Sequence, residues 1–166
     1  MSSTKIEFVN YNSRSQIDSI FNKPLRIVIW VDSVGCTGCK LQLDTWKYTI
    51  NDFKNIASDD IGYLFYLQFR DRGDLEFFLG IDDVFVDEYA GEDDEGDFND
   101  EMFDNRFPYP VIWDSIGSFG RLNSVSGYKC YIINKNSDIL YEGKPPFTPE
   151  ERNNYIKTIV EYLDKN

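Results

Sequence analysis

Residues 25–53 read LRIVIWVDSVGCTGCKLQLDTWKYTINDF and contain the strongest structural pattern in the chain. Their apolar run, Leu25–Val31, is rich in β-branched and aromatic residues, as expected for a strand buried on both faces of a parallel sheet. Beyond the turn Asp32–Gly35, apolar residues recur at helical spacing, at Cys39, Leu43, Trp46, Ile50 and Phe53. The stretch therefore predicts a buried strand followed by a helix, with Cys36 and Cys39 where the two meet.

The position of the two cysteines has a chemical consequence. Unpaired N–H groups and the positive end of the dipole at a helix N-terminus favour the thiolate over the thiol. The thiolate is the nucleophile in disulfide exchange, so we expect Cys36 to attack and Cys39, one helical turn further on, to resolve the mixed disulfide. Thr37 and Gly38 separate them, and Gly38 has no side chain to hinder their approach.

The rest of the chain predicts further strands and helices within a single domain, residues 1–166. An N-terminal extension, residues 1–22, contains a short edge strand at 5–9 and a short helix at 13–22. Strands are expected at 61–69, 109–114, 129–134 and 139–143, and helices at 74–79, at 115–124 and from Thr148 onward. Asp74 is the expected N-cap of the first of these helices. Strand, helix and strand in this order predict a parallel βαβ unit, and the last two strands predict a hairpin.

Residues 80–106 interrupt this pattern with a run of acidic residues. No Lys or Arg occurs between Arg72 and Arg106, while Asp and Glu are frequent and aromatic residues lie among them. We interpret the segment as a solvated acidic insertion at the edge of the sheet. Calcium binding is the alternative, but neither Gly91 nor Gly96 has acidic residues at the spacing of an EF-hand loop.

The composition argues against several classes of function. The formal net charge of −12 disfavours binding to nucleic acid or to anionic membranes. The absence of histidine excludes Ser-His-Asp and Cys-His catalysis and histidine-ligated metals. With three cysteines, a zinc site would need a carboxylate or water as its fourth ligand, so we expect neither a metal nor another cofactor. No apolar segment is long enough to span a membrane, and residues 1–20 lack the apolar core of a signal peptide.

The cysteine motif and the order of elements resemble the thioredoxin superfamily, most closely its TlpA-type, periplasm-facing branch, over roughly residues 20–164. The segment FPYPVIWDSIGSFGRLNSV, residues 107–125, is similar to the TlpA-type strand and helix before the final hairpin, and YKCYIINKNSDILYEGKP, residues 128–145, is similar to that hairpin. The resemblance implies an α/β thioredoxin-like fold, with a central mixed β-sheet flanked by helices and interrupted by the acidic insertion. It also implies a thiol–disulfide oxidoreductase that acts on protein thiols and disulfides with an unidentified redox partner. The implied location is the cell envelope, and the cytoplasm is the alternative.

The chain departs from the family at two places. Thioredoxin-like enzymes usually carry a cis-proline just before the first hairpin strand, where this chain has Tyr128, or Lys129 after a slip of one residue. A cis bond before a residue other than proline costs about 3 kcal/mol, so a trans loop and a different groove are expected. Gly35 also replaces the usual aromatic residue before the first cysteine.

Two more residues near the motif have two interpretations each. Cys130 is either a small core residue, since free cysteine is among the most buried residue types, or a third redox thiol that approaches Cys36. Asp32 either accepts a proton from Cys39 or is a turn residue that caps the helix.

A redox-inactive, thioredoxin-like binding module is the main alternative function. Its acidic insertion would contact a partner protein, and both the missing cis-proline and the insertion favour it. Peroxiredoxin chemistry is less favoured, because Ile29 and Ser33 stand where that family has Pro and Thr.

Overall fold

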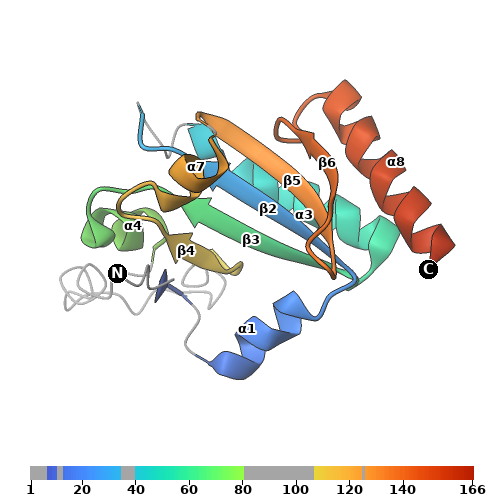
Figure 1. Cartoon of the computed structure of the whole chain (residues 1–166), viewed down its shortest axis with the longest axis horizontal. Helices are drawn as coiled ribbons and strands as arrows, with labels where there is room; N and C mark the ends of the chain where they lie inside the picture. Colours follow the sequence, from blue (N-terminus) through green and yellow to red (C-terminus); the bar gives the residue numbers. More distant parts are fainter. Residues whose placement is uncertain (1–6, 11–12, 35–39, 81–106, 125) are drawn as a thin grey trace, which may run out of the picture.

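A computed structural model describes residues 7–10, 13–34, 40–80, 107–124 and 126–166. Within these ranges the strands form one six-stranded mixed sheet in the order β1-β4-β3-β2-β5-β6 (Figure 1). The strands are β1 (Glu7–Phe8), β2 (Leu25–Val31), β3 (Ile61–Leu67), β4 (Val111–Trp113), β5 (Tyr128–Asn134) and β6 (Ile139–Gly143). The helices are α1 (Arg14–Phe21), α3 (Leu43–Ala57), α4 (Arg72–Phe78), α7 (Ser118–Asn123) and α8 (Pro149–Lys165). The predicted α/β class, with a central mixed sheet flanked by helices, is confirmed.

Strand β2 lies inside the sheet and is buried along its whole length. It pairs in parallel with β3 and antiparallel with β5. In this register Val31 lies opposite Leu67 of β3 and Tyr128 of β5. The end of β2, the end of β3 and the start of β5 therefore meet at one edge of the sheet.

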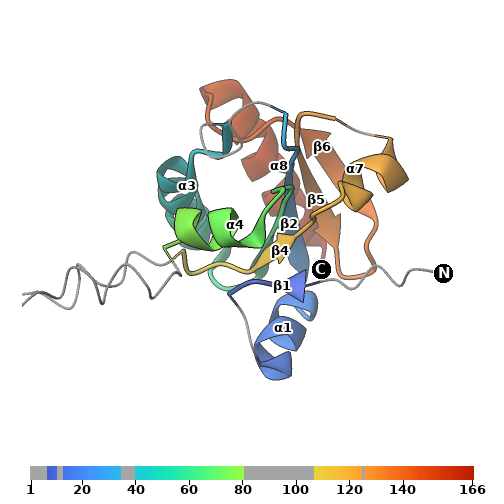
Figure 2. The ribbon, with the colours of Figure 1, turned by 90° about the vertical axis from the view of Figure 1, so that its left-hand side faces the viewer.

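Helices cover both faces of the sheet, as Figure 2 shows with the sheet seen nearly edge-on. On one face, β2 contributes Leu25, Ile27, Ile29 and Val31 to a core shared with α3, α4 and α8. On the opposite face, α1 and α7 pack against a smaller cluster. The residues of that cluster that are most buried are Ile20, Val28, Leu64, Ile112 and Tyr131. Burial on both faces explains why β2 and β3 are almost continuously apolar.

The helix after β2 differs from the sequence prediction at Gln42. Lys40 and Leu41 are helical, but Gln42 has φ 51° and ψ 62°, so the regular helix α3 begins only at Leu43. The predicted continuous helix from Cys39 to Phe53 is therefore wrong at this residue, because a left-handed backbone conformation ends the first helical segment. The predicted buried stripe of α3 is confirmed at Trp46, Ile50 and Phe53.

The N-cap of α4 differs from the prediction, and α7 is shorter than the predicted helix at 115–124. The N-cap of α4 is Asp71 rather than Asp74, because the Asp71 carboxylate accepts the N–H groups of Gly73 at 2.7 Å and Asp74 at 3.3 Å. Around α7, Phe119 packs against the sheet, whereas Ile116 and Leu122 are 57% and 82% exposed.

The N-terminal and C-terminal elements follow their predictions. Strand β1 is an edge strand that pairs antiparallel with β4, and α1 contacts β3. Helix α8 begins after Thr148, whose hydroxyl accepts the N–H of Glu151 at 3.3 Å. The strands β5 and β6 form the predicted antiparallel hairpin.

The predicted acidic insertion lies outside the described residues, apart from Gly80. Its flanks are described, and the N–H of Phe107 donates to the carbonyl oxygen of Leu79 at 3.3 Å. The described residues on either side of the segment are therefore joined by a hydrogen bond beside the end of α4.

We predict that Phe53→Ala lowers the free energy of unfolding by about 3–5 kcal/mol, because the ring is fully buried between α3 and the sheet and stacks on Tyr155. Tyr48→Ala on the same helix is the matched control. Its side chain is 76% exposed, so a change within about 0.5 kcal/mol is expected. Urea denaturation measures both, and equal losses would contradict this assignment of the two faces of α3.

Candidate functional site

Polar residues directly follow three neighbouring parallel strands at one edge of the sheet. Asp32 follows β2, Gln68 follows β3 and Asp114 follows β4. Two of them bind the neighbouring strand through their backbone. The N–H of Gln68 donates to Val31 O at 3.0 Å, and the N–H of Asp114 donates to Leu67 O at 3.0 Å. The carboxyl edge of a parallel sheet is the usual place for a site in open α/β folds. This pattern was present in the sequence, but only Asp32 was singled out from it.

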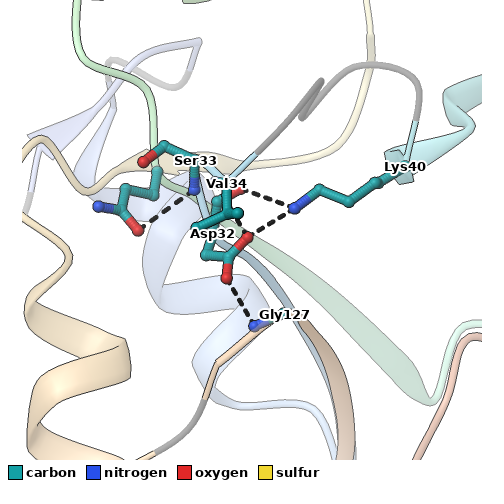
Figure 3. A network of polar contacts seen from close by, with 6 residues as sticks. Asp32, Ser33, Val34, Lys40 and Gly127 are labelled. Atoms are coloured by element: carbon teal, nitrogen blue, oxygen red, sulfur yellow. Dashed lines mark hydrogen bonds and ion pairs between the residues drawn. The ribbon is translucent and has the colours of Figure 1, made fainter.

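Asp32 is the centre of the polar contacts at this edge (Figure 3). Its Oδ1 accepts a hydrogen bond from Lys40 Nζ at 2.5 Å and from the N–H of Val34 at 3.2 Å. Its Oδ2 accepts the N–H of Gly127 at 2.6 Å, and its own N–H donates to Gly127 O at 3.0 Å. One carboxylate therefore joins the end of β2, the helical segment at Lys40 and the residue before β5.

These contacts keep Asp32 ionised although it is only 7% exposed. Burial by itself raises the pKa of Asp32, but the hydrogen bond and charge of Lys40, together with the N–H groups of Gly127 and Val34, lower that pKa below its usual value. The contact with Val34 N–H agrees with the interpretation of Asp32 as a turn residue. Its role as proton acceptor for Cys39 stays a prediction, and a lowered pKa makes the carboxylate a weaker base.

A second set of contacts packs the loop before α7 against the same edge. The side chain of Gln68 accepts the N–H of Ser33 at 3.3 Å. Gly117 has φ 67°, a backbone conformation that favours glycine, and a Cβ there would lie 2.8 Å from Gln68 Nε2 and displace the Gln68 side chain. Asp114 fixes the other side of this loop by accepting the N–H groups of Ser118 at 2.7 Å and Phe119 at 2.9 Å.

Tyr128 joins the start of β5 to the start of α3. Its hydroxyl accepts Trp46 Nε1–H at 2.5 Å and donates to Leu41 O at 3.2 Å. Burial, with a smaller effect of Cys130, raises the pKa of Tyr128, so the hydroxyl is neutral and able to donate. Leu41 immediately precedes the break at Gln42, and Tyr128 therefore holds the segment that links Lys40 to α3.

Lys129 does not join these contacts, because alternation along β5 turns it to the other face of the sheet. Its Nζ lies 3.5 Å from Glu142 Oε1 across the hairpin.

Cys130 lies in the core, opposite Ile29 of β2 and Gly143 of β6, and is fully buried. Burial raises the pKa of its thiol to about 12, against a lowering effect of the hydrogen bond with Tyr155. The interpretation of Cys130 as a buried core residue is confirmed. Its role as a third redox thiol stays a prediction, and a protonated thiol is a poor nucleophile.

Gly35, Cys36, Thr37, Gly38 and Cys39 lie outside the described residues, so the predicted roles of this motif stay predictions. The chain on either side is described. Val34 is 75% exposed, and Lys40 is paired with Asp32. The two flanks of the motif are thus held together by one ion pair.

A pocket of about 750 Å³ opens between the start of α3 and the end of α4. Its lining combines polar residues of α3 with apolar residues at the flanks of the acidic segment. These residues are Gln42, Leu43, Asp44, Thr45, Lys47, Phe77, Phe78, Leu79, Gly80 and Phe107.

Neither a metal cluster nor a membrane-spanning helix occurs in the part of the chain that the structure describes. No three His, Cys, Asp or Glu side chains there lie in a group that would hold a metal ion. No helix there is long and apolar enough to cross a bilayer.

Similarity to known proteins is found in structure rather than in sequence. No protein-family model and no curated protein matches the chain. A Chlorobium tepidum protein named as a thiol:disulfide interchange protein DsbE matches with a TM-score of 0.56 and 15% identity, over 89% of this chain and 84% of its own. A thiol-disulfide isomerase from Corynebacterium glutamicum matches with a TM-score of 0.54 and 12% identity, over 93% of this chain and 90% of its own. A thioredoxin-like protein from Porphyromonas gingivalis matches with a TM-score of 0.51 and 16% identity, over 86% of this chain and 77% of its own.

This chain has a thioredoxin-like fold. The fold predicted from the cysteine motif and the order of elements is confirmed. At these identities the likeness concerns the fold, and the chemistry has to be argued from the residues of this chain.

In the thioredoxin-like fold of this protein, Tyr128 is the first residue of β5, and Tyr128 or Lys129 as the counterpart of the cis-proline stays a prediction. No peptide bond is cis among the residues that the structure describes, as expected for a loop that lacks proline. Gly127, just before it, has φ 86° and binds both backbone and side chain of Asp32. The sequence did not reveal the two hydrogen bonds of the Tyr128 hydroxyl.

We predict that Tyr128→Phe lowers the free energy of unfolding by about 1–3 kcal/mol, because it leaves Trp46 Nε1 and Leu41 O without this buried partner. Tyr63→Phe is the matched control, since the Tyr63 hydroxyl is buried without a hydrogen-bond partner among the described residues. That change should be neutral or slightly stabilising. Chemical denaturation, monitored by circular dichroism, distinguishes the two variants. An unchanged free energy of unfolding in Tyr128→Phe would contradict these contacts.

We also predict that the stability difference between the wild type and Asp32→Asn depends on pH. Because folding lowers the pKa of Asp32 from 3.8, the ionised carboxylate stabilises the folded chain above that value. The contribution is lost as the pH falls through the folded pKa. Urea denaturation should therefore show the largest difference near pH 7 and a shrinking difference below about pH 4. A difference that grows on acidification would contradict the lowered pKa.

Proposed function

We propose that this protein is a thiol–disulfide oxidoreductase, in which Cys36 attacks and Cys39 resolves. One observation carries the proposal. The buried strand β2 ends at Val31, and the chain is helical at Lys40. The Asp32 carboxylate pairs with Lys40 across the intervening segment. The Cys-x-x-Cys sequence therefore connects the carboxyl end of a strand to a helix, which is the setting in which such a pair becomes reactive.

The proposed reaction is a two-step exchange that balances in electrons and atoms. The Cys36 thiolate attacks one sulfur of a protein disulfide, forming a mixed disulfide and releasing one substrate thiolate. The Cys39 thiolate then attacks the Cys36 sulfur, which forms the Cys36–Cys39 disulfide and releases the second substrate thiolate. Two electrons pass from the cysteine pair to the substrate, and the released thiolates take protons from solvent. A protein dithiol as redox partner reverses these steps and restores the reduced pair.

A protein is the class of substrate that the surroundings favour. Val34 and Ile116 are 75% and 57% exposed, and they adjoin Ser33 and Gly117, which both contact the Gln68 side chain. Exposed apolar residues beside a reactive motif suit an apolar polypeptide segment better than a small polar thiol. The cell envelope is the location that we propose, because disulfide chemistry is favoured in oxidising compartments.

One observation favours the second candidate, a redox-inactive binding module. The lining of the pocket between α3 and α4 includes Leu79, Gly80 and Phe107, which stand in the sequence on either side of most of the acidic segment. A partner that binds at this pocket and at the acidic segment would not need the cysteines.

The reduction potential of the cysteine pair tests the proposal. The protein is equilibrated in graded glutathione or dithiothreitol buffers, and its thiols are trapped by alkylation and counted by mass. We expect a reversible Cys36–Cys39 couple between roughly −120 and −270 mV, the range of working oxidoreductases. Buried Cys130 should stay unmodified in the folded protein throughout.

Single cysteine variants provide the matched controls. Cys39→Ser should accumulate a mixed disulfide with a protein substrate, because the resolving thiol is missing, while Cys36→Ser should form none. A disulfide that resists reduction below about −300 mV, or thiols that never pair, would reject the oxidoreductase and favour the binding module.

A further inference from the structure

The negative charge of this chain is concentrated in one segment. Residues 80–106 contain 12 of its 29 Asp and Glu residues and only one of its 17 Lys and Arg residues. The segment by itself therefore carries nearly all of the formal net charge of −12, and the rest of the chain is close to neutral. Such a concentration of one sign of charge attracts partners of the opposite sign and repels nucleic acid and anionic membranes.

The pocket between α3 and α4 is lined by residues from both flanks of this segment. Leu79 and Gly80 line it on one side in the sequence, and Phe107 lines it on the other. The N–H of Phe107 donates to Leu79 O at 3.3 Å, so the two flanks meet at the pocket. Asp82 and Asp83 follow Gly80 by two and three residues, and the length of the chain keeps their Cα atoms within about 11 Å of it.

The floor of the pocket is apolar and held in place by packing. Leu79 and Phe107 are only 2% and 3% exposed, and the Phe107 ring packs edge-on against Phe65 of β3 with 4.8 Å between the ring centroids. Phe77 also lines the pocket, and it is 58% exposed. A preformed apolar floor in a pocket of about 750 Å³ suits an apolar group of a binding partner.

The wall that α3 contributes to the pocket is polar. Asp44 and Lys47 belong to it, and Lys47 Nζ lies 3.8 Å from Asp44 Oδ1. The two side chains are 94% and 37% exposed, and a pair as exposed as this one is weak. The Asp44 carboxylate is therefore able to bind a cation of a partner beside the apolar floor.

We propose that this pocket is the docking site of a basic protein segment, which inserts an apolar side chain and whose Lys or Arg residues are attracted by the neighbouring acidic run. Two requirements select a polypeptide. The floor needs an apolar anchor, and the charge concentrated in residues 80–106 needs a partner with several positive charges. A small polyamine lacks the anchor, and an apolar small molecule lacks the charges. The inference goes beyond the proposed oxidoreductase function and does not depend on the cysteines.

Three fluorescently labelled peptides of equal length test the docking site on the intact chain. The first is rich in lysine and has one central phenylalanine. The second has alanine in place of the phenylalanine, and the third has glutamate in place of every lysine. We expect fluorescence anisotropy to show that the first binds at least about fivefold more tightly than either control, as for an anchor residue at an interface. Its binding should weaken as salt rises from about 0.1 M to about 1 M, because the Debye length falls from about 10 Å to about 3 Å.

Variants of the protein locate the apolar contact. Phe77→Ala removes the exposed ring and should weaken binding of the first peptide by about fivefold or more, the usual effect of losing an anchor contact. Tyr48→Ala is the matched control, because it removes a ring that is 76% exposed on α3 and outside the lining of the pocket. The affinity of Tyr48→Ala for the peptide should equal that of the wild type.

A second pair of variants tests the charge. Asp44→Lys should weaken binding of the first peptide, because it places a positive charge at the pocket. Asp164→Lys makes the same change of charge near the end of α8, on the other side of the molecule from α4 (Figure 1). It should alter the affinity by less than about twofold, because charges further away than a Debye length are screened. If Phe77→Ala does not fold, Asp44→Lys compared with Asp164→Lys decides, because the Asp44 side chain is 94% exposed.

Three results would overturn the inference. Equal binding of the lysine-rich peptide that lacks phenylalanine would show charge attraction without a role for the pocket. Equal binding of the glutamate-rich peptide would show apolar binding without charge complementarity. Absence of binding by all three would show that the pocket does not accept a basic segment, and a dimer in sedimentation that Phe77→Ala abolishes would assign it to a second copy of the chain. None of these results depends on the reduction potential of the cysteine pair, so the proposed oxidoreductase function is tested separately.

Discussion

A single buried carboxylate connects the parts of this molecule that surround its cysteine motif. Asp32 lies at the end of the central strand β2, and its oxygens accept hydrogen bonds from Lys40, Val34 and Gly127. Removing a charge from water is costly unless the charge is paired and hydrogen-bonded, and this one is both. The arrangement restricts where the turn after β2, the segment at Lys40 and the residue before β5 can lie.

The central position of β2 makes that arrangement possible. The strand is covered by α3 and α8 on one face and by α1 and α7 on the other, and it is paired along both edges. Such a strand has little freedom to shift, because a slip by one residue would exchange its two buried faces. Asp32 is therefore presented at a well-defined place, immediately beyond the last buried residue, Val31.

Tyr128, the first residue of β5, connects this strand to the segment before α3. Its ring is packed against the core, and its hydroxyl binds Trp46 and Leu41. These contacts hold β5 against the segment before α3, where the left-handed Gln42 interrupts the helix.

Much of the fold was predictable because its signals are local. The continuous apolar run of β2, the helical spacing of Trp46, Ile50 and Phe53, and the N-cap Thr148 each depend on residues that are near one another in the sequence. The order of these elements around the cysteine motif was enough to identify a thioredoxin-like fold. The choice of Asp71 rather than Asp74 as N-cap was missed, because both residues have the same short acidic side chain and only the backbone geometry distinguishes them.

The sequence by itself determined the class of fold, the central strand and the location of the cysteine pair after that strand, because periodicity and capping are properties of short segments. Only the tertiary structure decided the partners of Asp32, the contacts of Tyr128 and the burial of Cys130 with its raised pKa. Gly127 is separated from Asp32 by 95 positions and Leu41 from Tyr128 by 87. Contacts over such separations arise from the pairing of strands and the packing of helices, and no local pattern of residue types encodes which two polar groups will meet.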